Sequence, residues 1–200
     1  MPTGVHIRDA RQQLFDAAER VLLREGPNGL TSRAVTIEAG VAKGVLHRHF
    51  ADFDAFLAEL VLDRIAQIDD QAAALRASAG TGTVAGNLAG ALADLFDSVA
   101  VAIVSLVIFR DELRARLRQA RPTPGIPLLA EATTMIASYL GDEREMGRIA
   151  ADADVDTLAL SLIGTGHLLF AGREGIPAEP GAVDKVVTTV IADVVQRRLL

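Results

Sequence analysis

Apolar residues recur at helical spacing along almost the whole chain, and this periodicity restricts the fold more than any other sequence feature. Between Arg8 and Arg24 they fall on a single stripe, as expected of an amphipathic helix. Similar stripes follow, separated by short breaks that contain glycine, proline or aspartate. We therefore predict an all-α fold. The expected helices cover about residues 8–24, 32–39, 43–50, 53–75, 84–120 (as one or two helices with a bend near 98–101), 128–140, 157–170 and 183–194.

One segment is ambiguous. Val99 to Phe109 is rich in β-branched residues, which favour strands. A strand is therefore the alternative here, but the helical patterns on both sides favour a helix.

Composition excludes several classes of function. The 200 residues are half hydrophobic, which suffices for a sizeable core, and they include no cysteine, so disulfides and cysteine-ligated metals are excluded. Four histidines argue against a histidine-rich metal site, and no serine or histidine arrangement suggests a nucleophile with its base. We predict no enzyme activity, no cofactor and no metal.

The longest apolar run, Ser98 to Phe109, has twelve residues, whereas a membrane-spanning helix needs about 20. Charged residues interrupt the N-terminus where a signal peptide would be apolar. We predict a cytoplasmic protein that does not cross a membrane.

Charge is distributed unevenly along the chain. The net charge is −6, but residues 1–50 carry seven Arg or Lys against five Asp or Glu, while the rest is strongly acidic. A basic head on an acidic body suggests two functions in one chain.

Residues 31–50 have the pattern of a helix-turn-helix. Thr31 can cap a short helix, and Gly40 permits the positive φ of a sharp turn. Lys43, His47 and Arg48 would then point outward from a second helix that is free to enter a DNA major groove. Four apolar residues are spaced to fill the small core beneath these helices: Val35, Ala39, Val41 and Leu46.

The run GVAKGVLHRHF at 40–50, followed by ADFDAFLAELV at 51–61, resembles the DNA-binding signature of the TetR family of bacterial regulators. The usual form is Gly-Val-Ser-Lys-Gly-Thr-Leu-Tyr-Arg-His-Phe, then Ser-Lys-Glu or Ser-Lys-Asp. The similarity is close over Gly40 to Leu57, and the rest of the chain fits only by length and succession of helices.

This resemblance implies an all-α homodimer that binds double-stranded DNA. Residues 1–52 would form a three-helix DNA-binding domain, and residues 53–200 a helical ligand-binding and dimerisation domain. The function that the resemblance implies is that of a repressor released from a palindromic operator by a small hydrophobic effector. Seven residues are candidates for DNA contact: Thr31, Arg33, Ala42, Lys43, Val45, His47 and Arg48.

Four positions depart from the family pattern. Ala42 replaces the usual Ser, Val45 the usual Thr, His47 the usual Tyr, and Phe53 the usual Lys. Each removes a hydrogen bond or a phosphate contact, or shortens the reach of the side chain. The alternative function is therefore a helical ligand-sensing protein that has lost DNA binding.

The body should hold the effector. The candidate pocket residues are Leu92, Phe96, Val104, Ile108, Met135, Tyr139 and His167. Core packing is the simpler explanation for each of the first six taken alone, and the alternative for His167 is a role at an interface. The glycines at 82, 86 and 90 recur every four residues, a spacing that would let another helix approach closely.

The last two helices are expected to form a four-helix bundle across a two-fold axis. Asp152, Asp154 and Asp156 resemble the start of a calcium loop but lack its glycine and closing glutamate, and helix capping explains them better. The residues expected at the dimer interface are Val187, Val190, Ile191 and Val194 with Leu160, Ile163 and Leu168.

Overall fold

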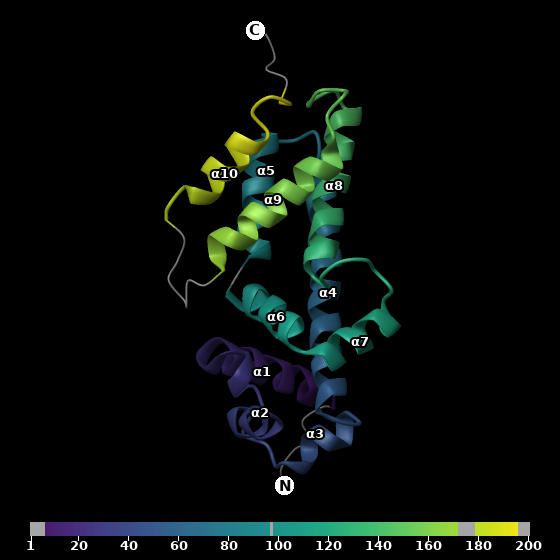
Figure 1. Cartoon of the computed structure of the whole chain (residues 1–200), viewed down its shortest axis with the longest axis vertical. Coiled ribbons are helices and arrows are strands. Elements are labelled where there is room, and N and C mark those ends of the chain that lie inside the picture. The colour runs from purple at the N-terminus through teal and green to yellow at the C-terminus, as the bar shows by residue number, and fades with distance from the viewer. Residues whose placement is uncertain (1–6, 97, 172–178, 196–200) are drawn as a thin grey trace. The chain divides into compact units, whose positions relative to one another are not determined.

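A computed structural model describes residues 7–96, 98–171 and 179–195 of the chain (Figure 1). These residues form helices and no strand ladder, apart from one isolated bridge between Ile149 and Val195, so the predicted all-α fold is confirmed. The helices are α1 (Ile7–Gly29), α2 (Ser32–Glu38), α3 (Gly44–His49), α4 (Phe53–Ala77), α5 (Val84–Leu95), α6 (Ser98–Phe109), α7 (Asp111–Ala120), α8 (Leu129–Glu145), α9 (Val155–Phe170) and α10 (Ala182–Val190).

The chain divides into two compact units. Unit 1 comprises Met1–Asp63 and Ala102–Thr123, and unit 2 comprises Arg64–Val101 and Pro124–Leu200. Unit 1 thus holds α1 to α3, the first part of α4, most of α6 and α7. This division by compactness differs from a single boundary after residue 52, since a later segment of the chain returns to the first unit.

The core of unit 1 is built around an aromatic cluster. Phe50, which ends the helix-turn-helix motif, lies 5.9 Å from Phe15 of α1 and 5.0 Å from Phe56 of α4 between ring centroids. All three rings are at most 6% exposed. Aromatic rings at these separations attract one another beyond simple burial, so the cluster fixes α3 against α1 and α4.

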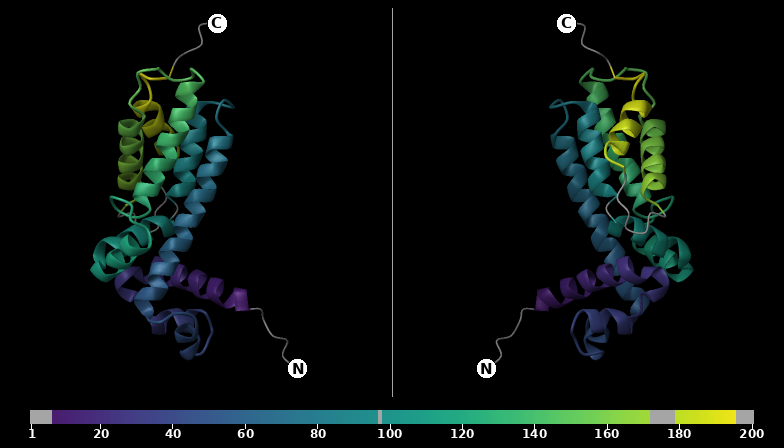
Figure 2. Two further views of the ribbon diagram at one scale, coloured as in Figure 1. Left: turned by 90° about the vertical axis from the view of Figure 1, so that its right-hand side faces the viewer. Right: turned by 90° about the vertical axis from the view of Figure 1, so that its left-hand side faces the viewer.

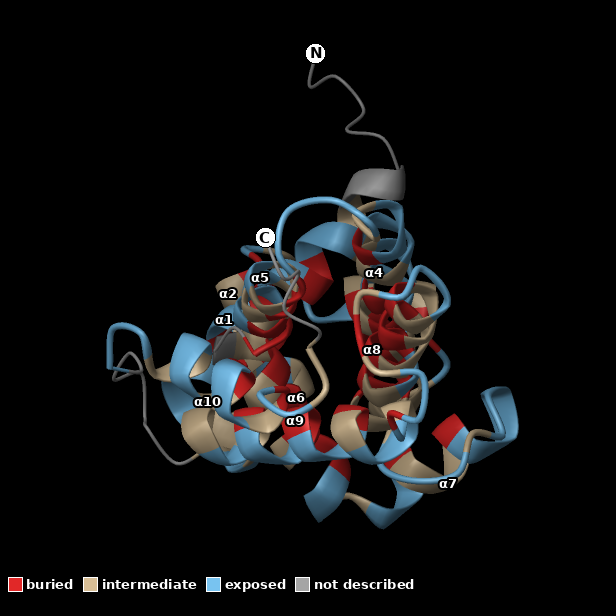
Figure 3. Cartoon of the chain, turned by 90° about the horizontal axis from the view of Figure 1, so that it is seen from above, coloured by how far each residue is buried: buried red, intermediate tan, exposed pale blue. Residues whose placement is uncertain are grey.

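Unit 2 is a helical bundle. The C-terminal part of α4 and α5 run side by side and are joined by a short turn, and α8 and α9 lie beside each other (Figures 1 and 2). Buried residues line the inward faces of these helices, while the outward faces are exposed (Figure 3). The largest fully buried side chain is that of Tyr139 on α8.

Local capping signals are realised as predicted. Thr31 Oγ1 accepts a hydrogen bond from the Ala34 N–H at 3.1 Å, and Asp52 Oδ1 accepts one from the Ala55 N–H at 2.7 Å. Asp154 caps α9 through the Thr157 N–H at 3.1 Å, as expected of a cap rather than a calcium ligand. Gly26 and Gly40 have φ values of 69° and 66°, and both interrupt the helical path.

Several boundaries differ from expectation. The segment 84–120 forms three helices rather than one or two, and Val99 to Phe109 is helical, so the strand alternative is wrong. The last helix ends at Val190, because residues 191–194 form turns. Of the loop expected at 172–181, residues 172–178 lie outside the described part of the chain.

Two packing predictions are also corrected. Val187, Ile191 and Ile163 are at most 2% exposed within this one chain, because α10 packs against α5 and α9, so these three do not form an intermolecular surface. The glycine repeat does not serve helix packing either: no atom outside its own helix lies within 4 Å of a Cβ added at Gly90.

Within the described residues, no single helix combines the length and the apolar composition that a membrane crossing needs; α5 and Val99–Phe109 meet these criteria only when taken as a bent pair.

Candidate nucleic-acid interface and ligand-binding region

The helix-turn-helix presents the predicted DNA-contacting residues at the surface of unit 1. Leu46 and Phe50 anchor α3 in the core, which turns the opposite face of α3 outward. Val45 is half-buried, and the other six candidates are exposed. These six are Thr31, Arg33, Ala42, Lys43, His47 and Arg48.

Arginines behind this face are neutralised within unit 1. Arg20 Nε lies 2.8 Å from Glu38, and Arg24 Nη1 lies 3.0 Å from the same carboxylate. These two guanidinium groups hold the pKa of Glu38 below its usual range. Arg11 on α1 pairs with Glu59 of α4.

The cationic side chains of the outward face have no such partners. Arg33, Lys43 and Arg48 form no ion pair with any residue that the structure describes. Glu38 is the single acidic residue between Leu30 and Phe50, and two arginines already neutralise it. The face therefore carries uncompensated positive charge, as expected of a surface that binds phosphates.

Phe53, which stands where the resembled family usually has lysine, has a structural role. Its ring stacks on Phe56 with centroids 5.6 Å apart. The Arg110 guanidinium lies 5.8 Å from the Phe53 centroid and donates a hydrogen bond to the Leu30 carbonyl at 3.3 Å. A cation above an aromatic face is attracted by the ring. Sequence reasoning missed this arrangement because Arg110 is distant in sequence.

A second arginine reinforces the same junction. Arg116 of α7 donates to Asp52 at 2.8 Å. The backbone N–H of Ala55 and this guanidinium together hold the pKa of Asp52 below its usual range. Arg110, which lies between α6 and α7, and Arg116 of α7 thus hold both the start of α4 and the segment before α2.

The structure distributes the predicted ligand-binding residues over its two units. Val104 and Ile108 belong to unit 1, whereas the other five lie in unit 2. Leu92 and Tyr139 are almost completely buried. Phe96 forms an aromatic cluster with Phe170, at 5.8 Å, and with His167, at 6.2 Å.

Unit 2 contains a cavity of about 320 Å³ between α4 and α5, and Met135 is the one predicted residue that lines it. Its walls include Gln71 from α4, Ser78 from the turn that follows α4, and Asn87 and Asp94 from α5. Sequence reasoning missed all four. The signal that could have found them is the glycine repeat on α5, since Gly86 and Gly90 also line the cavity.

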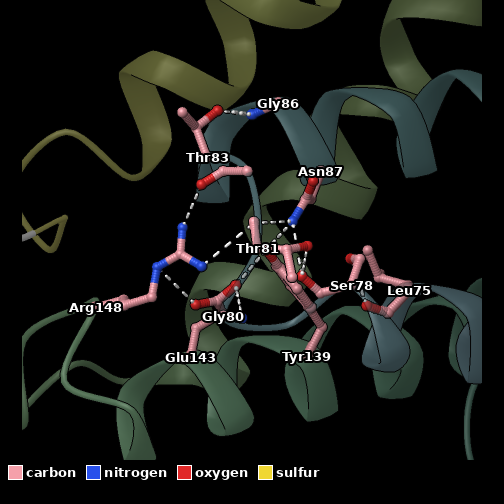
Figure 4. A network of polar contacts seen from close by, with 11 residues as sticks. Leu75, Ser78, Gly80, Thr81, Thr83, Gly86, Asn87, Tyr139, Glu143 and Arg148 are labelled. Carbon is pink, nitrogen blue, oxygen red and sulfur yellow. Dashed lines mark hydrogen bonds and ion pairs between the residues drawn. The ribbon is translucent and has the colours of Figure 1, made fainter.

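A buried polar network lies beside this cavity (Figure 4). Tyr139 donates a hydrogen bond to Glu143 at 2.7 Å and accepts one from Asn87 at 3.0 Å. Arg148 Nε lies 3.3 Å from Glu143 Oε2, and its Nη2 donates to the Gly82 carbonyl at 2.7 Å. Burial, together with the Glu143 hydrogen bond, raises the pKa of Tyr139. The network attaches the turn between α4 and α5 to α8.

His167 makes unit 2 sensitive to pH. Its Nδ1 is buried without a hydrogen-bond partner, and burial lowers the pKa of His167 below its ordinary value of 6.5. As the pH falls through 6.5, the unfolded chain binds a proton that the folded chain does not, so the free energy of unfolding decreases. We expect His167→Gln to reduce this loss when urea unfolding is compared at pH 7.5 and pH 5.5. The exposed His47→Gln should keep the wild-type loss; an equal loss in both variants would contradict the assignment.

Comparison with known proteins gives the following similarities. The family model described as bacterial regulatory proteins, tetR family, matches residues 14–60. The HTH-type transcriptional regulator PksA of Bacillus subtilis is 35% identical over 75 residues, which cover 34% of this chain and 37% of PksA. The chain therefore matches little more than a third of the length of that curated relative.

Solved structures are similar over nearly the whole fold. A TetR-family regulator from Mesorhizobium loti gives a TM-score of 0.70 at 17% identity and covers 96% of this chain and 100% of its own. FadR from Bacillus subtilis, solved in complex with stearoyl-CoA, gives 0.69 at 18% identity and covers 91% of this chain and 98% of its own. At such identities the likeness concerns the fold.

Proposed function

Because the chain belongs to the tetR family of bacterial regulatory proteins, whose members are transcriptional regulators and not enzymes, we propose that it represses transcription from a palindromic operator. A small, largely hydrophobic ligand in unit 2 would release it from DNA. The proposal places the protein in the cytoplasm, where it has access to chromosomal DNA.

The observation that carries this proposal is the unpaired cationic face of the helix-turn-helix. Arg33, Lys43 and Arg48 are exposed and form no ion pair within the described chain, although arginines nearby on α1 do. Unpaired cations on one face favour a polyanionic partner, because each phosphate contact releases a counterion from DNA. Val45 remains available for apolar contact with a thymine methyl group.

An exposed apolar stripe on α9 supports the homodimer. Leu160 and Leu168 are 64% and 77% exposed. Gly164 lies between them at a spacing of four residues, and no charged Asp, Glu, Lys or Arg occurs from Thr157 to Phe170. Large apolar side chains exposed along one uncharged helix face mark an interaction surface. A two-fold axis through this face would let each protomer present one helix-turn-helix to one half of a palindrome.

Repression requires a ligand that distinguishes two states of the protein. FadR of Bacillus subtilis, which has a similar fold, was solved with stearoyl-CoA, and this supports a body able to hold a small molecule with a large apolar part. The cavity in unit 2, which Leu75 and Met135 line, is the ligand site of our proposal.

The test uses DNA that the protein itself selects from a random duplex library. We expect Lys43→Ala and Arg48→Ala to weaken binding to the selected fragment. Each should reduce the slope of log K against log salt by about one unit, as the loss of one phosphate contact requires.

The chain supplies a matched control in Lys185, an exposed lysine on α10. Lys185→Ala should leave both affinity and slope unchanged. If the wild-type protein enriches no sequence even at low salt, the alternative function, ligand sensing without DNA binding, is favoured instead.

A further inference from the structure

The cavity of unit 2 is a groove between two antiparallel helix segments, and its two ends differ in chemistry. Asn87 Nδ2 donates to the Ser78 carbonyl at 3.3 Å, which sets these two residues at the same level of the α4–α5 hairpin. Gln71 precedes Ser78 by seven residues, and Asp94 follows Asn87 by seven. Seven residues are two helical turns, so Gln71 and Asp94 stand opposite each other at the end of the groove away from the turn.

This end of the groove offers two hydrogen-bond acceptors to a ligand, the Gln71 side-chain oxygen and the Asp94 carboxylate. Gln71 Oε1 is buried and has no hydrogen-bond partner. A buried acceptor without a partner is costly, and a ligand N–H at this position would remove that cost. The Asp94 carboxylate is exposed at the rim and adds a negative charge.

The middle of the groove is apolar and open. Leu75 and Met135 are 7% and 3% exposed and line it. Gly90 contributes no side chain, and nothing lies within 4 Å of a Cβ built there. A flat hydrophobic group can therefore lie along this stretch, and the volume of about 320 Å³ is at the small end of ligand sites.

We propose that this groove binds a small hydrophobic amine in its protonated form. The ammonium group donates hydrogen bonds to Gln71 Oε1 and to the Asp94 carboxylate, and the apolar part lies against Leu75, Met135 and Gly90. This assignment rests on the proposed ligand-responsive function and names the chemical class of the effector. No lysine, arginine or histidine lines the groove, so an anionic ligand would find no counter-charge there.

A ligand in the groove would also affect the turn between α4 and α5. Asn87 lines it and donates hydrogen bonds to Tyr139 Oη and to the Thr81 carbonyl, each at 3.0 Å. An occupant that displaces Asn87 therefore changes the bonds that hold the turn between α4 and α5.

Calorimetric titration of the full-length protein with three probes of equal size tests the proposal. The probes are 4-phenylbutylamine, 4-phenylbutanol and 4-phenylbutyrate, which are cationic, neutral and anionic. We expect the amine to bind about tenfold more tightly than the alcohol, because hydrogen bonds to charged groups are the stronger ones. The carboxylate should bind weakest of the three. Equal affinities of amine and alcohol would overturn the assignment.

Variants of the groove residues then test whether the amine binds in the groove. Gly90→Leu should fill the groove and abolish amine binding, whereas Gly90→Ala should retain it; the open space at this position lets both variants fold. Asp94→Asn and Gln71→Leu should each weaken the amine about fivefold, while the exposed Asp152→Asn should change nothing. Unchanged amine affinity in a folded Gly90→Leu variant would contradict the site.

The selection of DNA from the random library distinguishes failure of the amine site from failure of the repressor proposal. If the amine binds in the groove but the protein selects no DNA, the repressor proposal fails and the amine site stands. If selected DNA is bound and another class of compound releases it while no amine binds, the amine site fails and the repressor proposal stands.

Discussion

Replacing Arg148 with alanine is expected to lower the free energy of unfolding by about 3–5 kcal/mol, because it leaves a buried carboxylate without a counter-charge. The Glu143 side chain is fully buried, and Arg148 Nε lies 3.3 Å from its Oε2. That oxygen has no hydrogen-bond partner in the structure. Arg148→Ala also removes hydrogen bonds to the carbonyls of Thr81 and Gly82. Urea unfolding followed by circular dichroism measures the loss.

A double-mutant cycle separates the charge from these carbonyl contacts. In a Glu143→Gln background no negative charge is buried, so Arg148→Ala should cost about 1–3 kcal/mol less than in the wild type. The ion pair of Arg76 and Asp142 on the same unit is more exposed and provides the comparison, so Arg76→Ala should cost much less than Arg148→Ala. Equal costs of Arg148→Ala in both backgrounds would show that the ion pair is not what stabilises the network.

Introducing a charge on α9 should have the largest effect on function. We expect Leu168→Glu to convert the proposed homodimer into monomers, because two carboxylates would have to be buried near its two-fold axis. Each monomer then binds one half-site alone. Because the second half-site is no longer bound by a linked protomer, operator affinity falls about 10²-fold or more. Light scattering measures the mass, and a gel shift on the selected fragment measures the affinity.

Leu160→Glu, eight residues earlier on α9, should act in the same way. The control is Ile126→Glu, which places the same charge on an exposed apolar residue of the loop before α8. That variant should remain dimeric and bind DNA as the wild type does. A dimeric Leu168→Glu variant would exclude α9 as the interface.

The features that were predictable from the sequence are those set by neighbouring residues. Thr31, Asp52 and Asp154 each cap a helix, because the side-chain oxygen accepts a hydrogen bond from the backbone N–H three residues later. Their role therefore depends only on local spacing. The turn at Gly40 likewise depends only on the local sequence. The helix-turn-helix motif could be located for this reason, before any tertiary contact was known.

The parts that could not be predicted depend on pairs distant in sequence. Arg110 lies over the ring of Phe53, and no local signal connects residues 53 and 110. The apolar stripe on the last helix is evident in the sequence. Its periodicity predicts only that one face is buried, and not whether the same chain or a second copy covers that face. Val187 and Ile191 turned out to be covered by the same chain.

The candidate ligand site shows the same limit. Met135, a predicted pocket residue, lines the cavity, whereas no sequence signal points to Gln71 and Asp94, because a cavity arises from the spacing of helices. The four-residue spacing of Gly86 and Gly90 predicts that another helix approaches α5 closely at these positions. The structure instead leaves open space above Gly90, since α4 and α5 diverge enough to leave a groove.

The two arginines at the start of α7 and within it have a consequence for the exchange of segments between related proteins. Arg110 and Arg116 hold Leu30, Asp54 and Asp52, so the DNA-reading half of the molecule is encoded by two stretches of the gene. A chimera made by a single crossover after the helix-turn-helix would inherit the carboxylates from one parent and their guanidinium partners from the other. Working hybrids therefore need residues 102–123 to be transferred together with the head.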